Sequence, residues 1–214
     1  MDSENLKIFS KDGKRLGVAS RVEVHKNGYW HEAFHCWFIS KMNDINYIDL
    51  QLRSKTKKEN PYLLDITAAG HLLSHETISD GIREIKEEIG VDVTFDELLP
   101  LGVINYCTVK EEYIDNEFAH VFLYKSNYTL DDYILQQEEV SGIVRIKFDD
   151  FHDLWLGDKK EIRISGFEID EGSKNIINQT ASKDKFVKHP APYYESVIKS
   201  IQSILNNENT TLQE

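Results

Sequence analysis

Two features that mark secreted and membrane proteins are missing from this sequence. It has only two cysteines, Cys36 and Cys107, and both stand in apolar runs, so we expect buried thiols in a reducing compartment. No apolar run approaches the length needed to span a membrane, and the start Met-Asp-Ser-Glu-Asn lacks a signal-peptide pattern. These absences predict a soluble cytoplasmic protein without a membrane partner.

Positive charge is also scarce. The 25 lysines and arginines are outnumbered by 37 aspartates and glutamates, which gives a formal net charge of −12. Such a charge opposes nonspecific binding to nucleic acid or to an anionic membrane surface. It says less about a phosphorylated small molecule, because a bound metal ion inverts the local field. We therefore do not expect a nucleic acid partner, and a phosphorylated small molecule stays open.

No internal repeat or low-complexity segment divides the chain. Its 214 residues, of which 40% are hydrophobic and 11% aromatic, suit one large domain with extensions. We place this single domain at residues 1–207, with a hairpin at 1–18 and a C-terminal extension at 157–207. We expect fraying from Asn206 onward and a flexible tail at 208–214.

Apolar periodicity predicts a series of strands interrupted by one central helix. The expected strands are 6–9 and 15–18 in a hairpin, one around Val22 and Val24, then 31–39, 47–53, 98–109, 117–125, 139–148 and 161–169. A short helix is expected from Asp149 or Asp150 to Trp155, and an amphipathic helix from Pro190. This order fits an α/β or α+β sandwich.

The central helix combines an apolar stripe with a cluster of acids. Isoleucines recur at helical spacing and can form one buried stripe, namely Ile78, Ile82, Ile85 and Ile89. Glu84, Glu87 and Glu88 stand at i, i+3 and i+4, which places three carboxylates together on a neighbouring face. On a solvated surface their repulsion costs only about 0.2–0.5 kcal/mol per pair, so a wet acidic face is the alternative to a binding site.

The residues around the three glutamates favour a cation site over a wet surface. Gly70 precedes the helix, and Glu76 stands six positions after Gly70. Gly90 stands where the helix is expected to end. We expect Arg83 to orient Glu76 or Glu87 by ion pairing. Hard divalent cations take carboxylate oxygens and keep waters or substrate phosphate oxygens in their remaining positions.

This arrangement resembles the Nudix box, in which a glycine, a glutamate and Arg-Glu-x-x-Glu-Glu-x-Gly form a loop, a helix and a loop. The matching residues are Gly70, Glu76, Arg83, Glu84, Glu87, Glu88 and Gly90. Only six residues separate Glu76 from Arg83, where the family pattern has seven. A residue lost inside the helix would turn Glu76 by about 100°, so we expect Ser79 or Asp80 to cap the helix and confine the deletion to the loop. The resemblance implies the Nudix fold, a mixed sheet between helices.

Outside the box the chain resembles the Nudix branch that includes type I isopentenyl diphosphate isomerase. The matching pieces, within residues 5–156, are Arg21-x-x-x-His25, His31-x-Ala33-Phe34-x-x-Trp37, Arg53-Ser54-x-x-Lys57, Gly70-His71 and Asp115-x-Glu117. The resemblance implies a second metal site, for Zn²⁺ or Mn²⁺, whose ligands would be His25, His31, His71, Asp115 and Glu117. Other histidines are expected to be ordinary core or surface residues, namely His35, His75, His120, His152 and His189.

One substitution separates this chain from the isomerases. The isomerase cysteine that precedes the Gly-His pair is Ala69 here. Alkene isomerisation needs an acid and a base on opposite faces of the carbon skeleton, and a methyl side chain neither gives nor takes a proton. Hydrolysis is therefore our leading hypothesis, isomerisation the first alternative, and diphosphate or nucleotide binding without catalysis the second.

The expected enzyme is a Nudix pyrophosphohydrolase that cleaves a nucleoside diphosphate derivative or another organic diphosphate. Glu84, Glu87 and Glu88 would hold Mg²⁺ or Mn²⁺, and Glu87 or Glu88 would act as general base, with Glu139 a weaker candidate. The expected partner is this small-molecule diphosphate. For the oligomeric state, we consider a homodimer. Substrate choice is expected to depend on loops and on residues 157–214.

A basic segment precedes the box. Residues 53–58 read Arg-Ser-Lys-Thr-Lys-Lys in an otherwise acidic protein. In one interpretation this is a solvated loop. In the other, Arg53 binds phosphate oxygens in a bidentate manner and Lys57 acts as a point charge, with Gly70 beside them in the substrate site.

Overall fold

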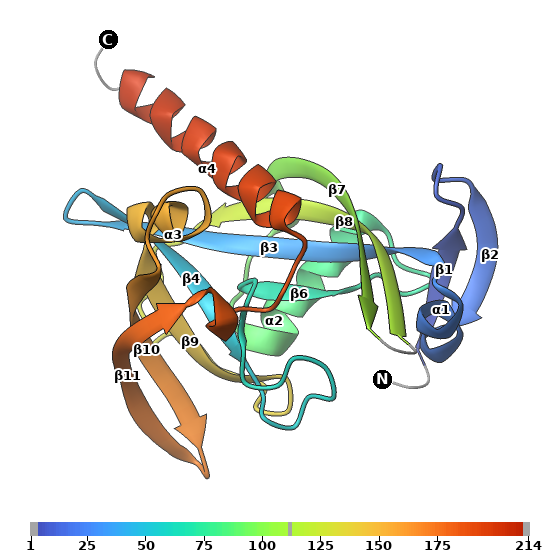
Figure 1. The fold of residues 1–214 in the computed structure, drawn as a ribbon, viewed down its shortest axis with the longest axis horizontal. Helices are drawn as coiled ribbons and strands as arrows, with labels where there is room; N and C mark the ends of the chain where they lie inside the picture. Colours follow the sequence, from blue (N-terminus) through green and yellow to red (C-terminus); the bar gives the residue numbers. More distant parts are fainter. Residues whose placement is uncertain (1–3, 111–112, 212–214) are drawn as a thin grey trace.

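The structure is a computed structural model that describes residues 4–110 and 113–211. Within these residues the strands join one mixed sheet with helices on both sides (Figure 1). The strands are β1 (Asn5–Phe9), β2 (Arg15–Ser20), β3 (Trp30–Met42), β4 (Ile45–Arg53), β5 (Leu64–Asp65), β6 (Ala68–His71), β7 (Leu99–Lys110), β8 (Tyr113–Lys125), β9 (Val140–Lys147), β10 (Glu161–Asp170) and β11 (Ser173–Ser182). The helices are α1 (Arg21–Asn27), α2 (Arg83–Ile89), α3 (Phe148–Trp155) and α4 (Ala191–Thr211), with short 3-10 turns η1 (Ile78–Ile82), η2 (Phe95–Glu97) and η3 (Lys183–Lys185).

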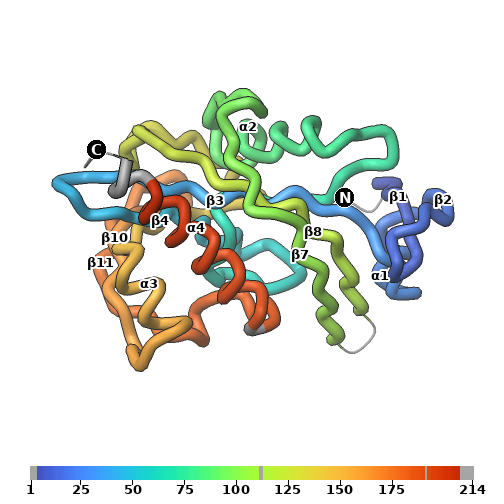
Figure 2. The backbone as a smooth tube through the Cα atoms, turned by 90° about the horizontal axis from the view of Figure 1, so that it is seen from above, coloured from blue at the N-terminus to red at the C-terminus, as the bar shows by residue number. Residues whose placement is uncertain are grey.

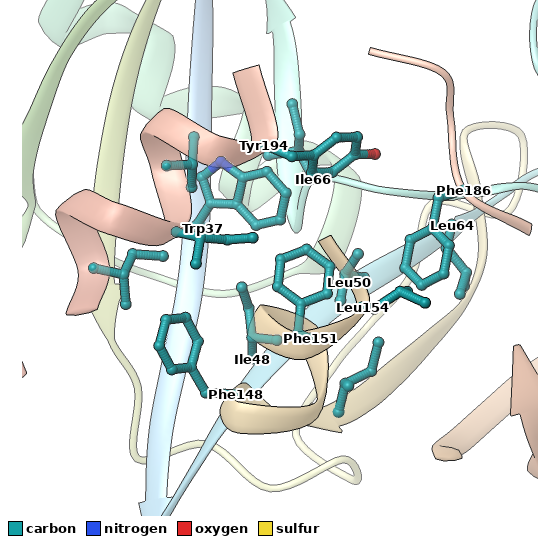
Figure 3. Packing of buried hydrophobic residues seen from close by; sticks show 14 of the residues in the cluster. Trp37, Ile48, Leu50, Leu64, Ile66, Phe148, Phe151, Leu154, Phe186 and Tyr194 are labelled. Carbon is teal, nitrogen blue, oxygen red and sulfur yellow. The ribbon is translucent and has the colours of Figure 1, made fainter. Parts of the chain in front are cut away.

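β3 runs through the centre of the sheet and is covered on both faces. Phe34 and Phe38 pack in one core cluster with Ile85 of α2. Trp37 points to the other side and packs with Phe151 of α3 (Figure 3). Side chains alternate along a strand, so a strand covered on both faces reads as a nearly continuous apolar run. Figure 2 shows α2 and α3 on opposite sides of β3.

The neighbours of β3 bring distant parts of the sequence together. β8 pairs with β3 in parallel, which sets His31 opposite Glu117. β6 pairs with β3 in the antiparallel direction, which sets His35 opposite Ala69. Residues of β3, β6 and β8, which are far apart in the sequence, therefore lie side by side at one end of β3.

The strand expected around Val22 and Val24 is wrong, because residues 21–27 form α1. Ser20 caps this helix, and the carboxylate of Glu23 accepts hydrogen bonds from the Ser20 N–H and hydroxyl at 3.1 and 2.8 Å. Gly28 ends the helix in the left-handed conformation, with φ 65°. These are capping signals at both ends, and they outweigh the alternation of two valines.

Three further differences concern exposed parts of the molecule. Cys107 is exposed on β7, which pairs only with β8 among the described strands, whereas Cys36 is buried as expected. β11 was not expected, since it is a largely exposed polar strand that pairs with β10 at the sheet edge. α4 continues to Thr211, beyond the fraying expected from Asn206. Among the described residues, no helix has the length and hydropathy needed to cross a membrane.

A buried ion pair fixes the segment between β8 and β9. Arg145 donates to both carboxylate oxygens of Asp49 at 2.7 Å, and the Tyr133 hydroxyl donates to the same carboxylate at 2.7 Å. The Gln136 N–H donates to the carbonyl oxygen of Glu88 at 3.0 Å. Losing one partner of a buried pair costs about 3–5 kcal/mol, so this network holds the segment against the end of α2.

Candidate active site

A cavity of about 470 Å³ is lined by residues of α2, β6, β7 and β8. Its volume lies in the range of pockets that hold small organic ligands, roughly 300–1,000 Å³. Acids, histidines and cations share its wall, among them Glu84, Glu88, His71, Glu117, Lys57 and His189. The cavity thus collects side chains from the Nudix-like segment, from the strands behind it and from the C-terminal extension.

The shortened box is accommodated before α2 begins. Residues 78–82 form η1, and α2 starts at Arg83. The cap is at Thr77 and not at Ser79 or Asp80, since the Asp80 carboxylate accepts hydrogen bonds from the Thr77 N–H and hydroxyl at 2.7 Å each. Gly90 closes α2 at φ 72°. The acidic helix therefore keeps its regular spacing despite the missing residue.

Gly70 allows the carboxylate of Glu84 to approach β6. A β-carbon at residue 70 would lie 2.1 Å from Glu84 Oε1, so any other residue would displace this carboxylate. Burial raises the pKa of Glu84 to about 7, against the opposing effect of the Arg83 guanidinium and with a further contribution from the Glu87 carboxylate. Glu84 is thus a largely buried acid at the cavity wall, with 13% of its side chain exposed.

Glu88 is the second buried acid of this wall. Its Oε2 accepts hydrogen bonds from the Ala69 N–H at 3.0 Å and from Gln51 Nε2 at 3.2 Å. Burial, and then the neighbouring Glu84 carboxylate, raise the pKa of Glu88 well above its ordinary value. A divalent cation favours the charged forms of two such acids and takes their oxygens as ligands. The donor set fits Mg²⁺ or Mn²⁺.

Arg83 forms hydrogen bonds with the other carboxylates of the box. It donates to both oxygens of Glu76, at 2.5 and 3.1 Å, and to Glu87 Oε2 at 3.0 Å. It also lies 2.8 Å from Glu84 Oε1. The side chain of Glu87 is 52% exposed. The three glutamates of the acidic face therefore divide, with Glu88 buried, Glu84 largely buried and Glu87 held at the rim by Arg83.

A second cluster joins four elements. His25 of α1, His31 of β3, His71 of β6 and Asp115 of β8 each offer one ligand atom, and these atoms all lie within 4.8 Å of one another. Among the residues that the structure describes, this is the group of acids and histidines whose ligand atoms lie close enough together to hold one metal ion. The sequence resemblance named these same four residues.

The ring nitrogens of this cluster have defined protonation. His25 Nδ1 donates to the carbonyl oxygen of Arg21 at 2.8 Å, and His31 Nδ1 donates to that of Tyr29 at 3.1 Å. Because a carbonyl oxygen only accepts, each Nδ1 carries a proton, and Nε2 is the ring nitrogen that lies in the cluster. Such backbone contacts orient histidine ligands in metal sites.

Three atoms inside the cluster lack partners. His25 Nε2, His31 Nε2 and Asp115 Oδ1 are buried and make no hydrogen bond with described residues. Burial, and then the neighbouring His71 imidazole, lower the pKa of His31 to about 4, so the His31 imidazole is neutral at pH 7. Unpartnered buried acceptors cost about 1–3 kcal/mol each, and neutral imidazole is the form that binds a metal. The cluster therefore fits a Zn²⁺ or Mn²⁺ ion.

Glu117 lies beside the cluster and has partners of its own. It approaches His71 Nε2 at 3.4 Å and His35 Nε2 at 3.3 Å, and the Tyr106 hydroxyl donates to it at 2.7 Å. Burial opposes ionisation here, but hydrogen bonds from His35 and His71 outweigh it and hold the pKa of Glu117 well below its ordinary value. Glu117 is thus a fixed negative charge between the cluster and the core.

Arg53 and Lys57 both line the cavity. Arg53 Nη1 donates to Asp65 at 2.9 Å, and its other nitrogens donate to the carbonyl oxygens of Asn60 and Glu59. Lys57 contacts the carboxylate of Glu139. Their role as phosphate ligands stays a prediction, and Arg53 also fixes the loop that follows β4.

Four polar residues of the site were missed from the sequence. His35, Asp65 and Tyr106 are buried on strands, and His189 precedes α4. A polar residue within an apolar run is the one signal that His35 offered. His189 stands in a segment without any motif, so only the fold brings it to the cavity.

Comparison with known proteins places the chain in a family. An uncharacterized Nudix hydrolase of Clostridium acetobutylicum is 35% identical over 207 residues, which cover 94% of this chain and 98% of the relative. The chain belongs to the Nudix hydrolase family. Its Nudix resemblance is confirmed, and the chain is a hydrolase of this family. No family model matches it.

Other similar proteins include both hydrolases and isomerases. Nudix hydrolase 3 of Arabidopsis thaliana is 32% identical over 157 residues, 71% of this chain and 20% of the relative. Isopentenyl-diphosphate Delta-isomerase 1 of Photorhabdus laumondii is 30% identical over 126 residues, 56% of this chain and 68% of the relative. A crystal structure from Deinococcus radiodurans superimposes with a TM-score of 0.53 at 19% identity, covering 68% and 85% of the two chains. The expected mixed fold is confirmed.

Proposed function

We propose that this Nudix hydrolase is a cytoplasmic, Mg²⁺- or Mn²⁺-dependent enzyme that cleaves a diphosphate linkage in a nucleoside diphosphate derivative or another organic diphosphate. The observation that supports this proposal is a pair of acids, the buried Glu88 and the largely buried Glu84, which share one cavity wall beside Gly70. Two adjacent carboxylates repel each other when both are ionised, and a cation bound to their oxygens stabilises this ionised form.

The side chains around this pair suit an anionic ligand. Lys57, Lys188 and Arg83 bring positive charge to the cavity wall. Arg83 already pairs with Glu76 and Glu87, so it contributes order more than free charge. A divalent cation at Glu84 and Glu88 would neutralise the negative charge that develops on the diphosphate during cleavage.

The histidine cluster is proposed as a second ion site. Its unpartnered atoms, His25 Nε2, His31 Nε2 and Asp115 Oδ1, offer nitrogen and oxygen donors from three elements. Mixed imidazole and carboxylate donors favour Zn²⁺ or Mn²⁺ over Mg²⁺. Glu117 adds a nearby negative charge held by His35 and Tyr106.

Isomerisation is the second candidate, because isomerases are among the relatives and His25, His31, His71 and Asp115 lie together in this chain. Ala69 argues against it, since this position supplies no proton donor or acceptor. Deuterium incorporation into isopentenyl diphosphate in D₂O tests this candidate directly. We expect no incorporation above the background without protein.

The hydrolase proposal is tested with a panel of organic diphosphates and phosphate or pyrophosphate release as the signal. We expect turnover of at least one class with Mg²⁺ or Mn²⁺ and a loss of at least 100-fold with EDTA, restored by adding the metal back. Binding of the panel without turnover would instead identify a non-catalytic diphosphate-binding protein. Metal-independent turnover would contradict the proposed role of Glu84 and Glu88.

A further inference from the structure

His189 brings the C-terminal extension into the cavity. It lies between η3 and α4, outside residues 5–156, which carry the isomerase resemblance. Two contacts anchor its segment, since the Val187 N–H donates to the Leu64 carbonyl oxygen at 2.8 Å and the Tyr194 hydroxyl donates to the Val187 carbonyl oxygen at 2.8 Å. The side chain of His189 is 10% exposed and lines the same cavity as Glu84 and Glu88.

Asp65 orients the imidazole of His189. Asp65 Oδ1 lies 2.8 Å from His189 Nε2, while Oδ2 accepts a hydrogen bond from Arg53 at 2.9 Å. Burial opposes ionisation of Asp65, but His189 and Arg53 outweigh it and lower its pKa to about 2. Because an ionised carboxylate only accepts hydrogen bonds, Nε2 carries the proton that it donates to Asp65, and Nδ1 is the ring nitrogen that remains for another contact.

That second nitrogen is available to a ligand. Within the described part of the chain, His189 Nδ1 has no hydrogen-bond partner, and it is not among the buried unpartnered atoms. The groups that face the ring are Asp65 of β5, His35 of β3, Tyr106 of β7, and Tyr193 and Tyr194 of α4. Their hydroxyls are engaged elsewhere, as Tyr106 donates to Glu117, Tyr193 contacts His35 and Tyr194 donates to Val187. Nδ1 therefore remains for a ligand in the cavity that His189 lines.

In its neutral form, the imidazole of His189 accepts a hydrogen bond at Nδ1. A water can donate that hydrogen bond and present its oxygen to phosphorus, whereas a phosphate oxygen only accepts hydrogen bonds. The glutamates of the box are already engaged, Glu87 by Arg83 and Glu88 by the Ala69 N–H. We propose that His189, oriented by Asp65, is the general base of the diphosphate hydrolysis on which this inference rests.

The proposed step is balanced without any further reactant. One O–H bond of the water breaks, its proton moves to His189 Nδ1, and the water oxygen bonds to phosphorus. The P–O bond to the bridging oxygen breaks, and its electron pair leaves with the departing phosphate, which then takes the proton from Nδ1. Asp65 stays ionised throughout and stabilises the imidazolium, as the aspartate of a Ser-His-Asp triad does.

His189→Gln tests the proposal, because glutamine keeps an N–H donor for Asp65 but takes no proton. We expect kcat to fall about 10²–10⁴-fold, with KM within about threefold of the wild-type value. Exogenous imidazole should raise the activity of His189→Ala at least tenfold. The matched control is His152→Gln, which changes a histidine paired with Asp153 at 3.2 Å outside the cavity and should leave kcat unchanged.

A binding measurement separates catalysis from structure. With methylenediphosphonate and Mg²⁺ added to the full chain, we expect the NMR signals of the His189 imidazole to shift and those of His152 to stay in place. Wild-type kcat in His189→Gln would overturn the inference while leaving the hydrolase proposal intact. A large loss without imidazole rescue and without an NMR shift would assign His189 to the fold and overturn the inference. Absence of hydrolysis by the wild-type protein across the diphosphate panel would overturn both.

Discussion

The carboxylate half of the cavity, with Glu84 and Glu88, comes from one helix, whereas the histidine half comes from four elements that include α1 and β8. Burial shifts both halves toward their neutral forms, because it raises the pKa of Glu84 to about 7 and lowers that of His31 to about 4. Neutral imidazole is ready to bind a metal, whereas a protonated carboxyl group must first release its proton. The two halves therefore differ in what ion binding requires of them.

The largest expected effect comes from comparing Glu88→Gln with Glu87→Gln. Glu88 is buried between Ala69 and Gln51, whereas Glu87 is half exposed and pairs with Arg83. We expect Glu88→Gln to lower kcat/KM about 10³-fold, equivalent to about 4 kcal/mol of transition-state stabilisation. Glu87→Gln should cost about tenfold or less. Steady-state kinetics with saturating Mg²⁺ measures both.

Glu195→Gln, at a partly exposed position of α4, serves as the control and should have no effect on turnover. Equal losses in Glu87→Gln and Glu88→Gln would contradict the division of the acidic face into a buried and a rim carboxylate. Circular dichroism spectra should be superimposable for all three variants.

The histidine half is tested by its metal content. His71→Asn removes one of the four donors of the cluster, and we expect the affinity for Zn²⁺ or Mn²⁺ to fall at least 10–100-fold, since even partners of a metal ligand contribute that much. Elemental analysis after dialysis should show about one equivalent of metal in the wild-type protein and none in the variant. Metal retained in His71→Asn would place the ion elsewhere. His120→Asn, which removes a contact to Glu32 outside the cluster, is the matched control.

The smallest effect concerns stability as a function of pH in the metal-free protein. The raised pKa of Glu84 means that the native state binds more protons than the unfolded state between pH 4.5 and 7, so its contribution to stability is lost as pH rises through this window. The lowered pKa of His31 has the opposite sign, because the unfolded state binds more protons between pH 4 and 6.5 and stability is lost as pH falls.

Urea unfolding in EDTA from pH 4.5 to 6.5 measures both contributions. Glu84→Gln should make the slope of stability against pH more positive, and His31→Gln should make it more negative, each by at most about 1.4 kcal/mol per pH unit. Slopes that change in the same direction in the two variants would show that burial does not neutralise both halves.

The acidic helix was the part of the site most open to sequence analysis. Its residues lie within one segment, and their spacing of three and four positions is a property of any α-helix. The deletion after Glu76 was correctly confined to the segment before α2, although Thr77 forms the cap. The division between Glu87 and Glu88 was not visible, because it depends on Arg83 and on the approach of β6.

The histidine half was named only through a resemblance. A strand was expected around Val22 and Val24, just before His25, yet this segment forms α1, since the capping residues Ser20, Glu23 and Gly28 decide the local structure. The buried environment expected for Cys107 was wrong, because apolar neighbours in sequence do not reveal that one face of β7 is open. Periodicity describes a segment, whereas burial depends on what covers it.

By itself, the sequence determined the strand-rich fold class, the acidic helix between Gly70 and Gly90, and the family, because each of these rests on local spacing. Only the tertiary structure decided which acids are buried and that His189 meets Asp65, 124 residues away in the chain. The physical reason is that desolvation and ion pairing depend on distance in space. Spacing along the chain fixes such distances only within one helix or strand.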